Sequence, residues 1–424
     1  MKGAFTRRPV LAWAFYDWAN SAFALSVLAT LYPLFLGDYW SAGDSGSSVT
    51  ARLSFVNGTA SIVVAVLAPL LGAISDRGGA RKRFLLFFAI LGIVMTGGLF
   101  FVSKGNWPVA LGLYAMASIG FYSGNVFYDS LLLNVAKDNE YESVSSFGFA
   151  LGYFGSALLL TLNVWMVTSP ATFGLESTEI AVRIAFLLVA VWWLIFTVPL
   201  MLFVDEEKKD SIPLRQAVGE GYRQLRETFA EIKRYRNVFL FIVAFWLYID
   251  GVHTVIQLAT HFGQRLGFSS SDLLLALLMT NFIGFPATVF FGWLGSRIGP
   301  RKVIYIGLAV YIAVTIFAAF LQNITQFFIM AGAVGVVQGA VQSMSRAFFA
   351  QLVPKEKAAE FFGFYNMIGK FAAVIGPFLV GFMALISDNP RWSIAVLLPL
   401  FVAGAILLSR VPTTIEPIVG EPAP

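Results

Sequence analysis

Hydrophobic residues form long apolar runs along the chain, and short polar segments separate these runs. Twelve runs are long enough to cross a bilayer, which takes about 20 consecutive apolar residues in a helix. Helices are required because lipid offers no hydrogen-bond partner to an open backbone. The pattern therefore predicts an all-α membrane protein of twelve transmembrane helices. We expect these at residues 11–36, 53–75, 84–103, 108–136, 145–167, 182–204, 237–262, 271–296, 301–321, 325–350, 359–386 and 392–409.

The longest polar stretch, residues 205–236, divides the runs into two sets of six. Its apolar residues recur at spacings of three and four, which predicts an amphipathic helix on the membrane surface or against the cytoplasmic loops. These residues are Leu214, Val218, Tyr222, Leu225, Phe229 and Ile232. The predicted organisation is a six-helix bundle at 1–204, this linker, a second six-helix bundle at 237–410 and a cytoplasmic tail at 411–424.

The two sets of runs resemble each other in sequence. The segment "GAISDRGGARKR" at 72–83 follows the second run, and "GWLGSRIGPRKV" at 292–303 follows the eighth. The triplet "FGF" occurs at 147–149 in the fifth run and again at 362–364 in the eleventh. Matches at equivalent places and similar spacing indicate duplication of a six-helix unit. We therefore expect two pseudo-symmetric six-helix bundles.

Composition supports a membrane protein and argues against several other classes. Hydrophobic residues make up 58% of the 424 residues and charged residues only 12%, against about 25% charged in typical soluble chains. The chain has no cysteine, which excludes disulfides and thiolate chemistry. With only two histidines, a histidine metal site is not expected. We expect neither a cofactor nor a bound metal.

Positive charge is placed as in membrane proteins rather than as in nucleic-acid-binding proteins. The net charge is +5, but the basic residues lie mostly in short loops between the apolar runs. With the N-terminus in the cytoplasm, 22 Lys and Arg residues fall on cytoplasmic segments and 5 on outer segments. Cytoplasmic loops of membrane proteins carry such an excess. We expect both termini in the cytoplasm, a location in the cell (inner) membrane, and no nucleic-acid partner.

Five ionisable residues lie well inside the predicted spans, namely Asp17, Asp129, Asp250, Arg346 and Lys370. A charge at the centre of a span costs about 2.5–3.5 kcal/mol on insertion scales, so such residues usually have a function. At about 1.5 Å per residue, Asp17, Asp129 and Arg346 share one layer in the cytoplasmic third. We expect Arg346 to pair with Asp17 or Asp129 and close an inner gate. The alternative is three separate charges wetted by a cytoplasmic vestibule.

Asp250 and Lys370 are expected nearer the middle of the membrane, with His253 on the same helical face as Asp250. A buried carboxylate whose surroundings change as a cavity opens can take up and release a proton. Asp250, Lys370 and Asp17 are therefore candidates for proton coupling. The alternative for the first two is a structural Asp250–Lys370 pair that locks two helices together.

Sodium is the alternative coupling ion, because Asp17, Asn20 and Ser21 offer hard oxygen ligands on one helical turn. Amide side chains also lie one turn from several of the buried charges. Amides together with charges of both signs suit a small solute that bears a carboxylate, an amine or both. The candidate solute-binding residues are Asp17, Asn20, Asn125, Asp129, Asp250, His253, Gln338, Gln342 and Arg346.

The loop at 72–83 contains candidate gating residues for the cytoplasmic side. Its glycines permit a tight turn and close helix approach, and Asp76 can pair with an arginine or face a helix N-terminus. Arg77 and Arg81 are further candidates, although basic loop residues can also act only as topology signals. The repeat has Ser296 where the first loop has Asp76. The predicted gating residues are Asp76, Arg77, Arg81, Asp129 and Arg346.

These motifs resemble the major facilitator superfamily, and several segments are similar to its vacuole-effluxer branch. That branch contains fungal vacuolar amino-acid exporters and bacterial relatives. The segments are "FYDWANSAFA" (15–24), "YIDGVHTV" (248–255), "QGAVQSMSR" (338–346) and "EFFGFYNMIGK" (360–370). The resemblance implies two helical bundles with alternating access to a central cavity, lined by spans one, four, seven and ten.

The sequence therefore predicts a secondary active transporter, acting as a monomer, that moves a small polar, amino-acid-like solute with protons. The alternative within transport is a proton-exchanging exporter of amphipathic compounds. A non-transporting membrane sensor or a membrane enzyme is the alternative of a different class. An enzyme is not expected, because the ionisable residues spread over two bundles and two depths. ATP drive is unsupported, because the sequence has no G-x-x-x-x-G-K-[ST] loop.

Overall fold

The computed structural model describes residues 5–206, 214–230, 235–371, 375–386 and 394–412. Within these ranges the chain is helical, with connecting turns and no strand. Ten helical segments are long and apolar enough to cross a membrane. They correspond to the first ten expected spans, so the apolar runs predicted the helices correctly there.

The first half of the chain forms one extended rod and then a series of long helices. The rod runs from Arg8 to Trp40 and joins α1, α2 and two π-helical segments at Phe23–Leu31 and Leu36–Trp40. The helices of this half are α1 (Arg8–Ala22), α2 (Tyr32–Phe35), α3 (Gly46–Gly78), α4 (Arg81–Gly98), α5 (Trp107–Ser130), α6 (Leu132–Val135), α7 (Tyr141–Thr168) and α8 (Thr178–Phe203).

The second half begins after α9 (Leu214–Ala230), the helix expected in the linker. Its further helices are α10 (Arg236–Arg265), α11 (Ser270–Ile298), α12 (Pro300–Ala318), α13 (Ile324–Leu352), α14 (Ala358–Phe371), α15 (Ile375–Ile386) and α17 (Leu398–Ser409). The expected span at 359–386 corresponds to α14 and α15, and residues 372–374 between them lie outside the described ranges. The expected span at 392–409 is described from residue 394.

Helix ends follow local sequence signals. Asn323 and Ser269 accept the backbone N–H groups of the residues three positions later, at 3.0 and 3.2 Å, and so cap α13 and α11. Gly79 ends α3 in the left-handed region, at φ 55°. Glycine adopts this conformation without the steric cost that a Cβ carries, which allows the sharp turn into α4.

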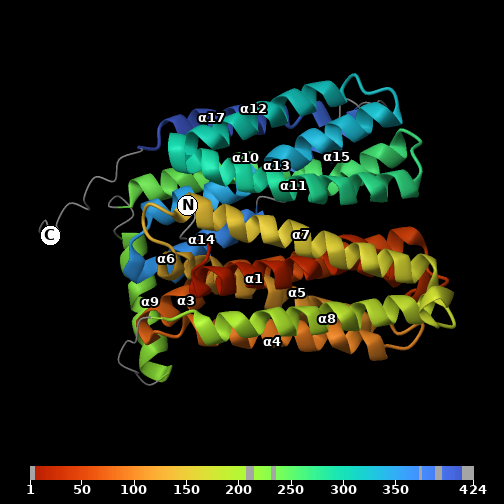
Figure 1. The fold of residues 1–424 in the computed structure, drawn as a ribbon, viewed down its shortest axis with the longest axis horizontal. Helices are drawn as coiled ribbons and strands as arrows, with labels where there is room; N and C mark the ends of the chain where they lie inside the picture. Colours follow the sequence, from red (N-terminus) through yellow and green to blue (C-terminus); the bar gives the residue numbers. More distant parts are fainter. Residues whose placement is uncertain (1–4, 207–213, 231–234, 372–374, 387–393, 413–424) are drawn as a thin grey trace, which may run out of the picture.

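The helices of the two halves occupy different parts of the molecule (Figure 1). Helices α1, α4, α5 and α8 lie in the lower part of the view, and α10, α12, α13 and α17 lie in the upper part. Helix α7 packs against both α11 and α13, and α14 packs against α3, so these helices join the halves. Helix α9 stands at one end of the long axis, and we call this the α9 end.

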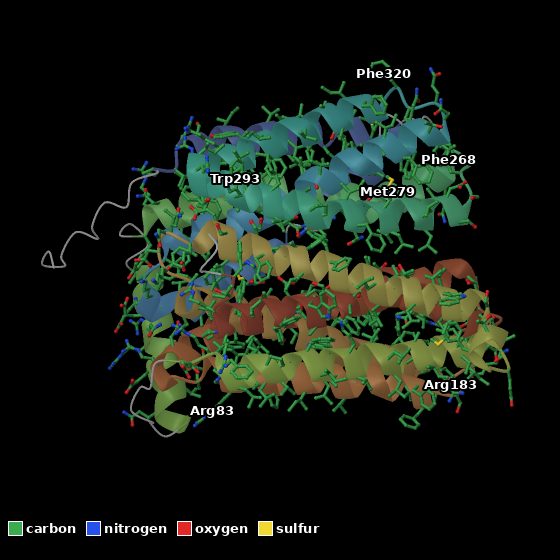
Figure 2. All side chains as sticks on the ribbon, in the orientation of Figure 1. Arg83, Arg183, Phe268, Met279, Trp293 and Phe320 are labelled. Atoms are coloured by element: carbon green, nitrogen blue, oxygen red, sulfur yellow. The ribbon has the colours of Figure 1, made fainter. Side chains whose placement is uncertain are left out.

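The side chains on the outer faces are largely apolar (Figure 2). Phe320 and Phe87 are among the exposed large hydrophobic residues, with 70% and 63% of their surface accessible. Arg83 and Arg183 lie at opposite ends of the long axis. An apolar outer face between charged ends fits a protein that spans a bilayer.

Candidate functional site

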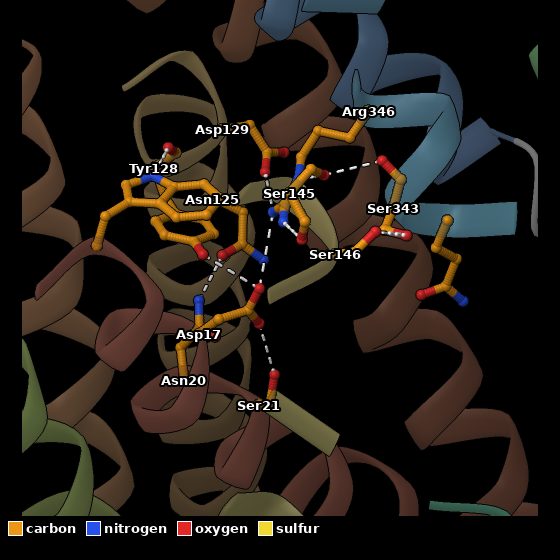
Figure 3. Close-up of polar contacts among 12 residues, drawn as sticks. Asp17, Asn20, Ser21, Asn125, Tyr128, Asp129, Ser145, Ser146, Ser343 and Arg346 are labelled. Carbon is orange, nitrogen blue, oxygen red and sulfur yellow. Dashed lines mark hydrogen bonds and ion pairs between the residues drawn. The ribbon is translucent and has the colours of Figure 1, made fainter. Parts of the chain in front are cut away.

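Arg346 lies between the two halves of the chain and is almost fully buried. Its guanidinium Nη1 is 3.0 Å from Oδ1 of Asp129 on α5, so an ion pair joins α13 to the first half (Figure 3). Only 2% of Arg346 and 8% of Asp129 are exposed. The other carboxylate oxygen of Asp129 accepts a hydrogen bond from Nδ2 of Asn366 on α14, at 3.0 Å. Asp129 is therefore held by two helices of the second half.

Asp17 on α1 is the second acid of this cluster. Its Oδ2 lies 3.7 Å from Nη1 of Arg346, and Tyr128 donates a hydrogen bond to the same oxygen at 3.1 Å. Ser21 donates to Oδ1 at 2.9 Å. Two buried carboxylates thus face one guanidinium, which leaves one excess negative charge when all three groups are ionised.

Aromatic rings and backbone enclose the guanidinium. Its central carbon lies 4.2 Å from the ring centre of Phe149, 4.8 Å from that of Trp13 and 5.4 Å from that of Tyr128. Cation–π attraction of this kind is strongest where water is excluded. A Cβ added to Gly148 would lie 2.8 Å from the Trp13 ring and 3.2 Å from Nη2 of Arg346. Glycine at this position is what lets α7 approach the cage.

A row of small polar contacts joins α7 to α13. Ser145 accepts a hydrogen bond from Nε of Arg346 at 2.9 Å and donates to the backbone oxygen of Ser343 at 2.8 Å. The hydroxyls of Ser146 and Ser343 are 2.9 Å apart. Toward the α9 end, Gln351 donates to the carboxylate of Glu142 at 2.7 Å. We call the contacts among Ser145, Ser146 and Ser343 the serine seam.

The amide residues predicted near the charges fall into two places. Asn20 donates to Asn125 at 2.6 Å, so this contact joins α1 and α5 within the first half. Gln342 accepts a hydrogen bond from the hydroxyl of Tyr153 at 3.1 Å across the halves, and Gln338 is buried one turn away. The contact with Asn125 uses the Nδ2 group of Asn20, and Ser21 of the same turn donates to Asp17.

Asp76 contacts the start of α14. Its carboxylate accepts the backbone N–H groups of Ala359 and Glu360, at 3.2 and 2.9 Å. These belong to the first turn of a helix, where N–H groups have no partner inside the helix and attract negative charge. Arg81 pairs with Asp76 at 2.6 Å and donates to the backbone oxygen of Lys355 at 3.0 Å. Arg77 is half-buried, and its Nε has no hydrogen-bond partner in the described part of the chain.

Helix α9 covers the same junction between α3 and α14. Gln224 donates to the carboxylate of Glu360 at 2.5 Å, and Lys357 donates to the hydroxyl of Thr228 at 3.1 Å. A Cβ added to Gly221 would lie 2.7 Å from the Ile74 side chain, so α9 packs closely on the end of α3. The predicted amphipathic helix therefore lies against the other helices at the α9 end.

Among the described contacts, none joins Asp250 to the Arg346 cluster, and the sequence predicted it at a different depth from the residues of that cluster. It is fully buried, and its two oxygens accept the N–H of Gly376 at 3.0 and 3.1 Å. Gly376 stands in the first turn of α15, so Asp250 holds this helix start. His253 is half-buried on α10. Lys370 lies in α14, but its side chain falls outside the described residues.

Several contacting residues were not among the candidates from the sequence. They are Trp13, Ser145, Phe149, Tyr153, Asn366 and Gly376. A serine or an aromatic residue inside an apolar run carries no signal of its own, because such residues commonly serve packing. The "FGF" repeat was one available signal for Phe149, since it marks a position shared by both halves.

Comparison with known proteins identifies relatives along most of the chain. The profile of the family described as "Vacuole effluxer Atg22 like" matches residues 42–140 and 133–414. An uncharacterized MFS-type transporter of Bacillus subtilis, YxiO, is 36% identical over 409 residues, which cover 95% of this chain and 94% of that protein. Autophagy-related protein 22 of Yarrowia lipolytica is 24% identical and covers 80% of this chain and 71% of that protein.

Solved structures are similar to this chain in fold. The proton:xylose symporter XylE, a major facilitator superfamily protein, matches with a TM-score of 0.73. The match covers 96% of this chain and 95% of that chain, at 16% sequence identity. At this identity the likeness concerns the arrangement of the helices alone.

Proposed function

The chain belongs to the Atg22-like vacuole effluxer family of MFS-type transporters, and from this premise we propose that it moves a small polar, amino-acid-like solute by alternating access. The twelve spans form two pseudo-symmetric six-helix bundles in this proposal, and proton movement drives the transport. The protein lies in the cell inner membrane as a monomer, with both termini and the α9 end in the cytoplasm.

The buried ion pair between Arg346 and Asp129 is the observation that carries this proposal. It joins the two halves of the chain at a depth that neither lipid nor open water reaches. Opening the α9 end requires this pair to separate. A lone buried charge costs several kcal/mol, so the groups must then be met by water, by a proton or by the charged groups of a solute.

Contacts between the halves gather toward the α9 end, which supports a closed cytoplasmic side. They include the Asp76 contact with α14, the Asp129–Arg346 pair and the serine seam. The bond between Tyr153 and Gln342 lies farther from that end than the serine seam. We therefore interpret the structure as the state in which the solute site is closed to the cytoplasm.

Asp17 is the candidate for proton uptake that the geometry favours. It shares one guanidinium with Asp129 and lies farther from it, at 3.7 against 3.0 Å. A proton on Asp17 removes the excess charge without breaking the closer pair. Asp250, the other acidic candidate, accepts the backbone N–H of Gly376 in the first turn of α15, and this contact between helices favours a structural role.

The solute class follows from the groups that become available when the cluster opens. A released guanidinium binds a carboxylate in a bidentate manner, and released carboxylates bind an ammonium group. Amides at Asn125 and Gln338 lie on the same helices, α5 and α13. An amino acid carries both charged groups on one small molecule, so it satisfies both parts of the site.

Transport by protein reconstituted in liposomes tests the proposal. We expect labelled amino acids to move against their gradient only when a pH difference is imposed. Asp17→Asn is expected to abolish this accumulation but to retain exchange of solute across the membrane. The matched control is Asp38→Asn, at an exposed position outside the cluster. Accumulation that survives in Asp17→Asn contradicts the proton role, and a wild-type protein that carries no amino acid contradicts the solute class.

A further inference from the structure

Tyr153 on α7 makes a polar contact between the two halves that lies farther from the α9 end than the serine seam. Its hydroxyl donates to the carboxamide oxygen of Gln342 on α13, at 3.1 Å. The residue itself is half-buried. Beyond it, the neighbouring Phe154 stacks on Phe285 of α11, with ring centres 4.8 Å apart. Tyr153 and Phe154 therefore both contact the second half at this level of α7.

The Tyr153 ring sits in a notch made by two glycines of the second half. A Cβ added to Gly339 on α13 would lie 2.8 Å from the ring, and one added to Gly284 on α11 would lie 3.5 Å from it. The first distance leaves no room for a side chain, whereas the second is ordinary contact. The notch thus admits one flat group from the first half and places it over α13.

A polar group beside this notch has hydrogen-bonding capacity that no described residue uses. The hydroxyl of Thr288 is buried and has no hydrogen-bond partner among the described residues. It lies 1.8 Å from where a Cβ of Gly339 would stand, which places it against the same notch. Gln338, one turn from Gln342 on α13, is 4% exposed. A buried hydroxyl without a partner is uncommon in native proteins, so the Thr288 hydroxyl points to a polar ligand.

Negative charge lies next to the turn that carries Tyr153. A Cβ added to Gly152 would lie 2.8 Å from Oδ1 of Asp17, so the carboxylate abuts the α7 backbone one residue before Tyr153. Asp17 contributes the excess negative charge of the Arg346 cluster. A ligand group that replaces the Tyr153 hydroxyl here is favoured if it is a hydrogen-bond donor with positive charge.

We propose that Tyr153 is a specificity-determining residue whose hydroxyl competes with the ammonium group of the solute for the carboxamide oxygen of Gln342. This inference rests on the proposed function, because it concerns the same transport site. An ammonium group carries three donors. While the Arg346 cluster is closed, these donors suit the oxygens of Gln342, Gln338 and Thr288, and the carboxylates become available to the ammonium group only when the cluster opens. When the solute is bound, the Tyr153 ring leaves the Gly339 notch and its hydroxyl gives up Gln342.

Ligand-induced thermal shifts on the purified full-length chain test this competition. The probes are the proteinogenic amino acids and, for those that bind, the matching carboxylic acids without the amine. The variants are Tyr153→Phe, Gln342→Leu and the pair together. Tyr305→Phe is the matched control, since it removes a hydroxyl that donates to the backbone oxygen of Ala405 at the same 3.1 Å, away from the notch.

We expect Tyr153→Phe to tighten amino-acid binding about fivefold, since one hydrogen bond no longer competes. The amine-free acids are expected to show no such gain, and Gln342→Leu should abolish the gain in the double variant. Gln342→Glu, which keeps the oxygen acceptor, is expected to retain the preference for amines.

Three results overturn the inference. One is amino-acid binding that Tyr153→Phe weakens or leaves unchanged, which indicates a purely structural hydroxyl. The second is an equal gain for amine-free acids. The third is wild-type protein that binds no amino acid, and this result also removes the solute class of the proposed function. The first two leave that class intact, so the two failures are distinguishable.

Discussion

The two repeated loops, residues 72–83 and 292–303, contact the opposite half of the chain in different ways. Each begins with a glycine at a helix crossing. A Cβ on Gly72 would lie 2.2 Å from the backbone oxygen of Ala359 on α14, and one on Gly292 would lie 2.6 Å from the Cβ of Ser146 on α7. The helix crossing is therefore repeated, and it positions α14 and α7 in equivalent ways.

The acid is the part that is not repeated. Asp76 crosses to the first turn of α14, whereas Ser296, at the equivalent position, donates at 2.8 Å to the backbone oxygen of Trp293 in its own helix. The arginines differ too, since Arg301 binds the backbone oxygens of Ser409 and Val411 within its own half. Close packing is thus common to both loops, while among the described contacts a charged side chain crosses between the halves at the first loop and not at the second.

Removing the carboxylate of Asp76 is expected to weaken the contact between the halves more than any other change at the two loops. Asp76→Ala leaves Arg81 and two N–H groups of α14 without their buried partner, a loss of about 3–5 kcal/mol for a broken buried pair. Ser296→Ala removes only an exposed local hydrogen bond and is expected to have little effect.

The measurement is a distance across the halves at the α9 end. The chain has no cysteine, so spin labels attach only at the introduced pair Asn139→Cys and Glu356→Cys, both exposed positions. Asp76→Ala should lengthen this distance in most molecules and reduce transport at least tenfold. Equal responses of Asp76→Ala and Ser296→Ala would show that the acid does not distinguish the loops.

Adding a methyl group at the two glycines is expected to have an intermediate effect. Gly72→Ala pushes a Cβ into backbone atoms of α14, which cannot turn away, and overpacking of this kind costs about 1–3 kcal/mol. Gly292→Ala meets the small side chain of Ser146, which lies on the serine seam and can shift with it. We expect both variants to lengthen the label distance, Gly72→Ala more than Gly292→Ala. A larger increase in Gly292→Ala than in Gly72→Ala would contradict this expectation and show that α11 and α7 cross more tightly than α3 and α14.

The smallest effect is expected at the exposed pair of Asp138 and Lys355, which also joins the halves at the α9 end. The atoms are 2.8 Å apart, but 73% of the Asp138 side chain and 57% of that of Lys355 are exposed. Hydrogen bonds from Lys355 and then Tyr141 lower the pKa of Asp138. An exposed pair contributes only about 0–1 kcal/mol.

The pH dependence of this pair follows from the direction of its shift. Because the folded pKa is below the ordinary value of about 3.9, the contribution is complete above that value and is lost as the pH falls through the lower, folded pKa. The label distance should therefore not change through this pair between neutral pH and about pH 5. Asp138→Asn is expected to alter it little at any of these values. A large change at neutral pH would contradict a minor, exposed contact.

The sequence predicted which charged residues meet, but it did not predict most of the groups that surround them. Depth along the spans placed Asp17, Asp129 and Arg346 in one layer, because a helix converts residue number into distance. The structure brings these three together. The sequence also offered Asp76 as a group that could face a helix N-terminus, from its position after the second span. The helix that it faces is α14.

The sequence could not predict hydrogen-bond partners that are backbone groups, or partners that depend on which way a helix face points. Asp250 bonds to the backbone N–H of Gly376 in α15, and an apolar run does not show which backbone N–H group a buried acid will meet. Tyr153 reaches Gln342 because α7 turns that face toward α13. Periodicity shows that a face is apolar, but it does not show which helix the face meets.

The serine seam has a consequence for how readily the halves part. Hydroxyl groups bind water about as well as they bind each other, and a protein hydrogen bond of this type adds a net of only about 0.5–1.5 kcal/mol. If Ser145, Ser146 and Ser343 separate, water can satisfy each of them where they stand. An interlocked aliphatic surface would instead resist wetting along its full length. The seam thus aligns the two halves while keeping the barrier to their separation low.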